Sequence, residues 1–148
     1  MKKFLCVIVL LASLTASSSY AGTPDLDLTK FSSVMVYSGL FNVLSNPSAY
    51  TGKIIKLTGQ FAFVYDEESG ENYYGVEVVD ASACCSIGID FVLKNSYKYP
   101  QDYPKAGEVI TVSGKFEQYR DGEDIFCRLV DADILQTRKI LLRSSDNL

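Results

Sequence analysis

Two segments of this chain, residues 52–61 and 107–116, repeat one another without a gap, and this repeat limits the available folds more than any other feature. Their sequences are Gly-Lys-Ile-Ile-Lys-Leu-Thr-Gly-Gln-Phe and Gly-Glu-Val-Ile-Thr-Val-Ser-Gly-Lys-Phe. Each segment follows a Pro-x-x-Tyr sequence, and each precedes a segment that ends in Val-Asp-Ala. Three matches in the same order indicate that the chain contains two equivalent structural units.

Both repeated segments alternate apolar and polar residues, which is typical of β-strands. We expect long strands at 52–65 and 108–119, each followed by a polar turn and a returning strand at 73–79 or 125–135. The apolar face of the first strand consists of Ile55, Leu57, Phe61 and Phe63. Each unit is therefore a β-hairpin, and the stretch 80–93 adds a single strand between the two hairpins.

Five strands in this arrangement predict a small β-barrel. Gly59 and Gly114, in the middle of the two long strands, indicate bends or bulges, which a small barrel needs where a strand turns a corner. We therefore expect an all-β fold: a five-stranded OB-like barrel closed by the first and fourth strands, with the third beside the fifth. A β-sandwich is the alternative, although five strands are few for that architecture.

A helix is expected before the barrel, from about Ser32 to Leu44. Apolar residues recur there at helical spacing. The predicted stripe consists of Val34, Tyr37, Leu40, Phe41 and Leu44. Because proline disfavours helical backbone in the residue before it, Pro47 ends this helix. A turn or a short helical step then leads into the first strand.

The first 21 residues have the pattern of a secretory signal peptide. Two lysines precede an apolar segment at 4–14, and Ser19-Tyr-Ala21 fits a small-x-small cleavage site. We expect three further parts: a flexible lead-in at 22–30, a barrel domain with its helix at 31–135, and a C-terminal tail at 136–148. The expected location is the periplasm or the cell exterior, with no membrane insertion once the signal has been removed.

The chain contains no histidine. This excludes Ser-His-Asp and Cys-His catalysis and any metal site with histidine ligands. Because no other catalytic motif is present either, we expect a protein that is not an enzyme and that carries no cofactor. The formal net charge is −4, and no basic stripe is available to neutralise phosphates, which argues against a nucleic-acid partner.

Three cysteines follow the signal peptide: Cys84, Cys85 and Cys127. Alternation along the stretch 80–93 places Cys85 on the core face and Cys84 on the other face. If the third strand lies beside the fifth, Cys127 comes near this pair. Because exported thiols are usually paired, a disulfide from Cys127 to Cys84 or Cys85 is the leading interpretation.

Three other interpretations of the cysteines stay open. Cys85 and Cys127 could be small buried hydrophobic residues. The three thiolates could bind a soft metal ion, with Asp80 or Asp131 as a fourth ligand. A redox or otherwise reactive role is the last alternative, although no basic side chain or helix N-terminus is visibly placed to lower a thiol pKa.

Other candidate site residues are aromatic or acidic. The loop before the second repeat contains Tyr97, Tyr99 and Tyr103, which are candidate ligand-binding residues because an aromatic rim suits a sugar- or peptide-binding barrel. The alternative is that these rings pack over one end of the barrel. Asp80 and Asp131, matched by the repeat, could form a carboxylate pair for acid–base chemistry or could bond local backbone N–H groups.

The run Asp-Ala-Ser-Ala-Cys-Cys-Ser-Ile-Gly-Ile-Asp-Phe at 80–91, with Tyr-x-Gly at 50–52, Gly-x-Phe at 59–61 and a later Tyr-Pro, resembles small exported bacterial OB-like proteins of unassigned function. The resemblance covers about 31–135 and implies a fold but no activity. We therefore expect an exported, non-enzymatic binding or interaction module for a protein, a peptide or a glycan. The alternative is thiol-based metal handling by the three cysteines.

Overall fold

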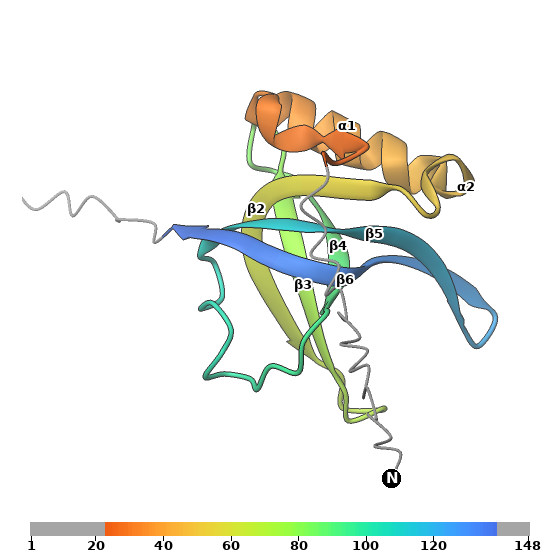
Figure 1. Ribbon diagram of the computed structural model, residues 1–148, viewed down its shortest axis with the longest axis vertical. Helices are drawn as coiled ribbons and strands as arrows, with labels where there is room; N and C mark the ends of the chain where they lie inside the picture. Colours follow the sequence, from red (N-terminus) through yellow and green to blue (C-terminus); the bar gives the residue numbers. More distant parts are fainter. Residues whose placement is uncertain (1–22, 139–148) are drawn as a thin grey trace, which may run out of the picture.

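The computed structural model describes residues 23–138, and these residues form a mostly β structure with two α-helices (Figure 1). The helices are α1 (Ser33–Ser45) and α2 (Pro47–Tyr50), and a 3-10 turn (Leu28–Lys30) precedes them. The strands are β1 (Leu26–Asp27), β2 (Ile54–Tyr65), β3 (Asn72–Val79), β4 (Ser86–Leu93), β5 (Val109–Asp121) and β6 (Asp124–Arg138). The five expected strands are therefore present as β2 to β6, and β1 is an additional short strand.

The strands form one mixed sheet whose order of pairing is circular. β2 pairs with β3, β3 with β4, β4 with β6 and β6 with β5, and β5 also pairs with β2. The pairing of β4 with β6 is parallel, and the other pairings among these five strands are antiparallel. Both expected pairings are observed. The first predicted strand pairs with the fourth, as β2 with β5, and the third lies beside the fifth, as β4 beside β6.

The two repeated segments pair with each other, and their contacts are reciprocal. Gly59 of the first lies opposite Ile110 of the second, while Ile55 of the first lies opposite Gly114 of the second. The backbone hydrogen bonds at the two ends of this strand pair match as well. The N–H of residue 52 donates to the carbonyl of residue 116 at 2.8 Å, and the N–H of residue 107 donates to the carbonyl of residue 61 at 2.8 Å. The sequence repeat is therefore a local pseudo-two-fold arrangement of β2 and β5.

The mid-strand glycines of this pair are required for close packing. A Cβ atom on Gly59 would lie 2.5 Å from the backbone oxygen of Glu77, and one on Gly114 would lie 2.9 Å from the Cβ of Leu129. Such distances are far below van der Waals contact, so any side chain here would push neighbouring strands apart. Because Gly114 also lies at a register shift between β5 and β6, the expected irregularity is present there.

Helix α1 runs across the molecule beside β2 (Figure 1). Its buried side chains are Val36, Leu40 and Val43, at positions i, i+4 and i+7 of one helical face. The predicted stripe is wrong in part, because Val34 and Phe41 are exposed. The error arises because Val34 and Phe41 also fit helical spacing, and only the sheet decides which apolar face is covered.

One core fills the space between α1 and the sheet. The side chains that are almost fully buried come from the helix, from all five long strands and from the 3-10 turn. They are Leu28, Leu40, Val43, Ile55, Leu57, Phe61, Val76, Ile89, Phe91, Ile110, Val112, Phe116, Leu129 and Ala132. The predicted apolar face of the first strand is confirmed, with Phe63 partly buried at its far end.

Residues 23–30, the described part of the predicted lead-in, contact both the sheet and the helix. The carboxylate of Asp25 accepts a 2.7 Å hydrogen bond from the backbone N–H of Ile54, and β1 pairs with the start of β2. Leu28 is buried and packs against Gly39 of α1. A Cβ atom on Gly39 would lie 2.8 Å from the Leu28 side chain, so the absence of a side chain on Gly39 makes room for Leu28. These contacts attach the segment to both the sheet and the helix.

Residues 136–138, the first part of the predicted C-terminal tail, belong to β6. β6 continues through Gln136 and Thr137 to Arg138, and these residues pair with the beginning of β5. The predicted signal peptide at 1–21 and the end of the chain from residue 139 lie outside the described residues. Between residues 23 and 138, no helix is long and apolar enough to cross a membrane.

Candidate functional site

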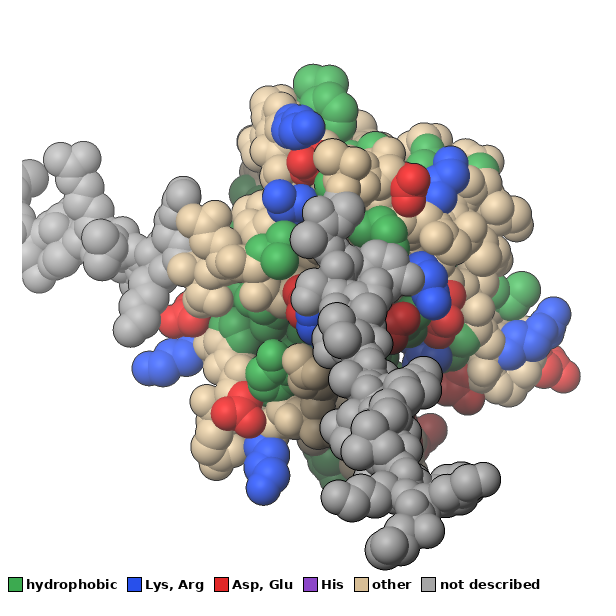
Figure 2. Space-filling model, viewed as in Figure 1, with side chains coloured by type: hydrophobic (Ala, Val, Ile, Leu, Met, Phe, Trp, Pro, Cys, Tyr) green, Lys and Arg blue, Asp and Glu red, His purple; other side chains and the backbone are tan. Residues whose placement is uncertain are grey.

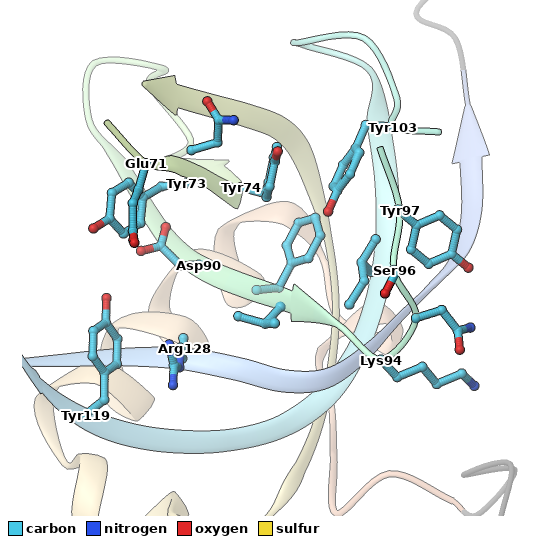
Figure 3. A pocket seen from close by; sticks show the side chains of 15 residues that line it. Glu71, Tyr73, Tyr74, Asp90, Lys94, Ser96, Tyr97, Tyr103, Tyr119 and Arg128 are labelled. Carbon is cyan, nitrogen blue, oxygen red and sulfur yellow. The ribbon is translucent and has the colours of Figure 1, made fainter. Parts of the chain in front are cut away.

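An open groove of about 500 Å³ lies where the first residues of β3, the last residues of β4 and the loop after β4 meet β5 and β6. Figure 3 shows Tyr97 and Tyr103 on one side of this groove and Asp90, Tyr119 and Arg128 on the other. Aromatic faces, a carboxylate and a guanidinium group thus surround one space. This groove is the candidate ligand-binding site.

The parallel pairing of β4 with β6 places Asp90 directly beside Arg128. Burial raises the pKa of the Asp90 carboxyl, and the charge of Arg128 partly offsets this effect. In the described part of the chain the Asp90 carboxylate has no hydrogen-bond or ion-pair partner within bonding distance. It is therefore a half-buried acceptor that a ligand hydroxyl or amide can use.

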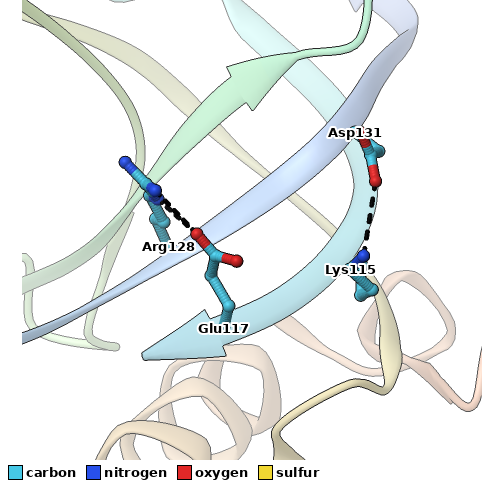
Figure 4. A network of polar contacts seen from close by, with 4 residues as sticks. All are labelled: Lys115, Glu117, Arg128 and Asp131. Carbon is cyan, nitrogen blue, oxygen red and sulfur yellow. Dashed lines mark hydrogen bonds and ion pairs between the residues drawn. The ribbon is translucent and has the colours of Figure 1, made fainter. Parts of the chain in front are cut away.

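Arg128 is held in position by two residues of β5. Its guanidinium group bonds Glu117 through Nε and Nη2, each 2.7 Å from Oε1 (Figure 4). The same guanidinium lies over the ring of Tyr119, 4.3 Å from its centroid. Desolvation by burial raises the pKa of Tyr119, so its hydroxyl stays neutral and can both donate and accept a hydrogen bond.

The three predicted loop tyrosines divide between the core and the groove. Tyr99 stacks face to face on Phe63, with ring centroids 4.2 Å apart, and it does not line the groove. Tyr103 stacks on Tyr74 at 4.1 Å, and its hydroxyl end lines the groove. Tyr97 is 44% exposed and contacts Tyr103 edge-on. Packing over the end of the sheet thus explains Tyr99, while Tyr97 and Tyr103 also border the groove.

The vicinal cysteines lie at the opposite end of the β3–β4 hairpin, in the loop between Asp80 and Ser86. The Cys84 and Cys85 sulfurs are 3.5 Å apart, and both residues are exposed. The Cys84 sulfur is 3.4 Å from Oδ2 of Asp80. These three side chains bring two thiols and one carboxylate together within 4.8 Å of one another.

Asp80 organises this loop through both of its carboxylate oxygens. Oδ1 accepts from the backbone N–H of Cys84 at 3.0 Å, and Oδ2 accepts from the hydroxyl of Ser82 at 2.9 Å. The Ser82 hydroxyl bond, followed by those from the cysteines, holds the pKa of Asp80 below its ordinary value. The bond to Cys84, then desolvation and the negative charge of Asp80, raise the pKa of Cys85.

Cys85 does not occupy the core face, which corrects the prediction for it. β4 begins only at Ser86, so the alternation that was extended back to Cys85 does not apply in the loop. Ala83, in the left-handed region at φ 54°, turns the chain there. Along the same alternation, Ile89 and Phe91 are buried, and Ile87 and Leu93 are partly buried.

Cys127 does not join the vicinal pair, and its expected disulfide to Cys84 or Cys85 is absent, since all three thiols are free. Cys127 precedes Arg128, which pairs with Asp90 in parallel register. Cys127 is therefore level with Ile89, which lies three residues or roughly 10 Å along β4 from Ser86 at about 3.3 Å per residue, and Cys85 precedes Ser86. A disulfide requires Cα atoms within about 7 Å. Cys127 instead packs partly against the core, and burial raises the pKa of its thiol.

The carboxylate pair suggested by the repeat does not form. Asp131 lies within β6 at a positive φ of 49°, and its carboxylate is 3.4 Å from Nζ of Lys115 on β5 (Figure 4). Asp80 lies in the β3–β4 loop and bonds Ser82 and Cys84. The two matched aspartates thus have separate structural roles, and Asp131 does not join the cysteine cluster.

Sequence reasoning missed the central residues of the groove: Tyr73, Asp90, Tyr119 and Arg128. One signal was available, because Asp90 interrupts the apolar run of residues 87–93. That run predicted a strand but not its neighbour, and only the parallel register with β6 brings Arg128 to Asp90. A comparison with protein-family models finds no match for the chain, and a comparison with curated proteins finds none either.

Proposed function

We propose that this chain is an exported, non-enzymatic binding module with an OB-like barrel fold, and that its groove binds a saccharide chain. The circular order of pairing, with a parallel contact between the third and fifth long strands, supports the OB-like fold. The predicted signal sequence supports export. OB-like barrels use one sheet face and its adjoining loops to bind extended polymers, including oligosaccharides.

One observation carries the proposed ligand class: tyrosine rings and the Asp90–Arg128 pair border the same open groove. A sugar ring has an apolar C–H face that can stack on an aromatic ring, and hydroxyl groups around its edge. Those hydroxyls can donate to the Asp90 carboxylate and accept from the Arg128 guanidinium. A small number of precisely placed polar groups among aromatic side chains is typical of ligand sites.

The groove is partly open to solvent rather than enclosed, which suits an extended ligand better than a small buried molecule. The charged residues that line the groove also support a neutral polymer as the ligand. Arg128 bonds Glu117 and Lys94 bonds Asp133, so neither of these two groove cations is free to bind a phosphate. A neutral saccharide does not require a free cation.

The proposal is tested by titrating a panel of neutral oligosaccharides, three to six sugar units long, into the mature chain and recording NMR chemical shifts and calorimetric heats. We expect at least one to shift the amide signals of β3, β4 and the loop 94–107. Asp90→Asn and Tyr97→Ala should each weaken that binding by about tenfold, which corresponds to roughly 1.4 kcal/mol. Tyr65→Ala is the matched control, because Tyr65 is also an exposed tyrosine but does not line the groove.

The pH dependence of this binding follows from the raised pKa of Asp90. Above that pKa the group is a carboxylate and accepts hydrogen bonds; below it the group is a neutral acid and loses acceptor capacity. Saccharide affinity should therefore fall as the pH is lowered through a value above the ordinary 3.8, and Asp90→Asn should remove this dependence. Binding of peptides alone, or binding that Tyr65→Ala weakens as much as Tyr97→Ala, would refute the saccharide groove.

A further inference from the structure

The loop that joins β3 to β4 has a property that the groove does not explain. Two thiols and a carboxylate face one another at the surface, with all three ligand atoms within 4.8 Å. Antiparallel pairing places Val79 opposite Ser86 at this end and Gly75 opposite Asp90 at the other. The cluster is thus about four residue pairs away from the groove and is separate from it.

The distances in the cluster match the ligand spacing of a tetrahedral metal site. A zinc ion with bonds of about 2.3 Å to two sulfurs separates them by roughly 3.8 Å at the tetrahedral angle. The Cys84 and Cys85 sulfurs are 3.5 Å apart. A linear two-coordinate ion with bonds of the same length would need the sulfurs roughly 4.6 Å apart. The spacing therefore favours a tetrahedral ion over a linear one.

The carboxylate fits the same geometry. With bonds of about 2.1 Å to oxygen and about 2.3 Å to sulfur, a tetrahedral ion holds these two ligands roughly 3.6 Å apart. Oδ2 of Asp80 is 3.4 Å from the Cys84 sulfur. The third pair, an Asp80 oxygen and the Cys85 sulfur, also lies within 4.8 Å, so rotations of these exposed side chains can bring all three ligand atoms to one ion.

The backbone contacts leave the ligand atoms available. Oδ1 of Asp80 bonds the N–H of Cys84, which anchors the carboxylate while Oδ2 faces the sulfurs. The only other partner of Oδ2 in the described chain is the exposed Ser82 hydroxyl. This hydroxyl also lies 3.1 Å from the Cys84 sulfur, and it can rotate away from both ligand atoms. Because Cys84 and Cys85 are both exposed, an ion can enter from solvent without a change in the fold.

We propose that Asp80, Cys84 and Cys85 form a surface site for a divalent d10 cation such as Zn²⁺, with a fourth coordination position open to water. Soft thiolate ligands select such ions over Mg²⁺ or Ca²⁺. On binding, each thiol gives its proton to the solvent, the metal forms two metal–sulfur bonds and one metal–oxygen bond, and no electron is transferred. An open position distinguishes this site from a closed structural zinc site and suits an ion that is taken up and passed on.

The test is a Zn²⁺ titration of the reduced mature chain against a chromophoric chelator, with Cd²⁺ as a second ion because cadmium–thiolate bonds absorb in the ultraviolet. We expect one ion per chain with a dissociation constant below about 1 μM and a cadmium–thiolate absorption band. Cys84→Ser and Cys85→Ser should each weaken binding by about 100-fold and abolish the band. Asp80→Asn, which keeps an oxygen to accept from Cys84, should weaken binding by about tenfold and keep the band.

Cys127→Ser is the matched control, because Cys127 is a free thiol outside the cluster, and it should bind both ions like the unmodified chain. Thermal unfolding without metal verifies that each variant is folded. A dissociation constant above about 10 μM for the reduced chain would overturn the site. So would full binding by Cys85→Ser, or a loss of binding in Cys127→Ser. None of these results bears on the saccharide groove, so the two proposals fail separately.

Discussion

The environment of each thiol sets its chemistry. Cys84 and Cys85 are exposed in a loop, whereas Cys127 is half-buried within β6. Burial raises the pKa of the Cys127 thiol, which lowers the fraction of reactive thiolate at a given pH. Sequence position alone does not distinguish these environments, since all three cysteines occur beside strand-forming residues.

A labelling experiment tests this difference at the level of single residues. The reduced, metal-free mature chain is treated with iodoacetamide at pH 8 and digested for mass spectrometry at successive times. We expect Cys84 to be alkylated at least tenfold faster than Cys127, because Cys84 is exposed and Cys127 is partly buried. Cys85 is exposed but has a raised pKa, so its rate should lie between the other two. In urea the three rates should converge. Equal rates in the native protein would contradict the placement of Cys127.

At the scale of elements, the contact between β2 and its neighbours depends on a missing side chain. Gly59 lies against both the backbone oxygen of Glu77 and the side chain of Val76. The backbone of β3 cannot move away without breaking its register with β2 and β4. At Gly59, β2 and β3 thus approach each other too closely for a side chain.

Gly59→Ala should therefore destabilise the protein by about 2–3 kcal/mol, in the range of overpacked cores. The measurement is urea unfolding followed by circular dichroism. Gly88→Ala is the matched control in β4, since a Cβ there would meet the nearest atom only at 3.4 Å. That variant should lose no stability and could gain up to about 0.5 kcal/mol from reduced chain entropy in the unfolded state. An equal loss in both variants would show that close approach is not the reason for Gly59.

At the scale of the whole molecule, helix and sheet share one core. Leu40 of α1 is fully buried together with residues of every long strand, while the tyrosine-rich loop covers another part of the sheet through Tyr99 and Tyr103. Figure 2 shows hydrophobic side chains at the surface in the region where Figure 1 draws α1, and Phe41 of this helix is exposed. The helix should therefore unfold together with the sheet.

Leu40→Ala should lower the free energy of unfolding by about 2–5 kcal/mol, and Phe41→Ala should change it by less than about 0.5 kcal/mol. In both variants the far-ultraviolet signal and the tyrosine fluorescence should change at the same urea concentration, because a single core unfolds in one transition. The chain has no tryptophan, so the fluorescence comes from its ten tyrosines, which include Tyr97, Tyr99 and Tyr103 of the loop. Loss of the helical signal at lower urea would contradict a shared core.

Local sequence patterns determined much of this structure. Period-two alternation marked β2 and β5, polar turns marked the hairpins, and helical spacing followed by Pro47 marked α1. The repeat of residues 52–61 at 107–116 also indicated which two strands pair. These features could be predicted because backbone geometry and residue spacing within one element suffice to produce them.

The tertiary structure alone decided which face of α1 is buried, that the lead-in is attached through Asp25 and Leu28, and that Cys85 lies in a loop. It also decided the groove, because the parallel register of β4 and β6 pairs Asp90 with Arg128 across 38 residues of sequence. Register between distant strands depends on the packing of the whole core, which no local pattern encodes. The repeat thus determined the frame of the molecule from sequence alone, whereas packing placed its chemically active side chains.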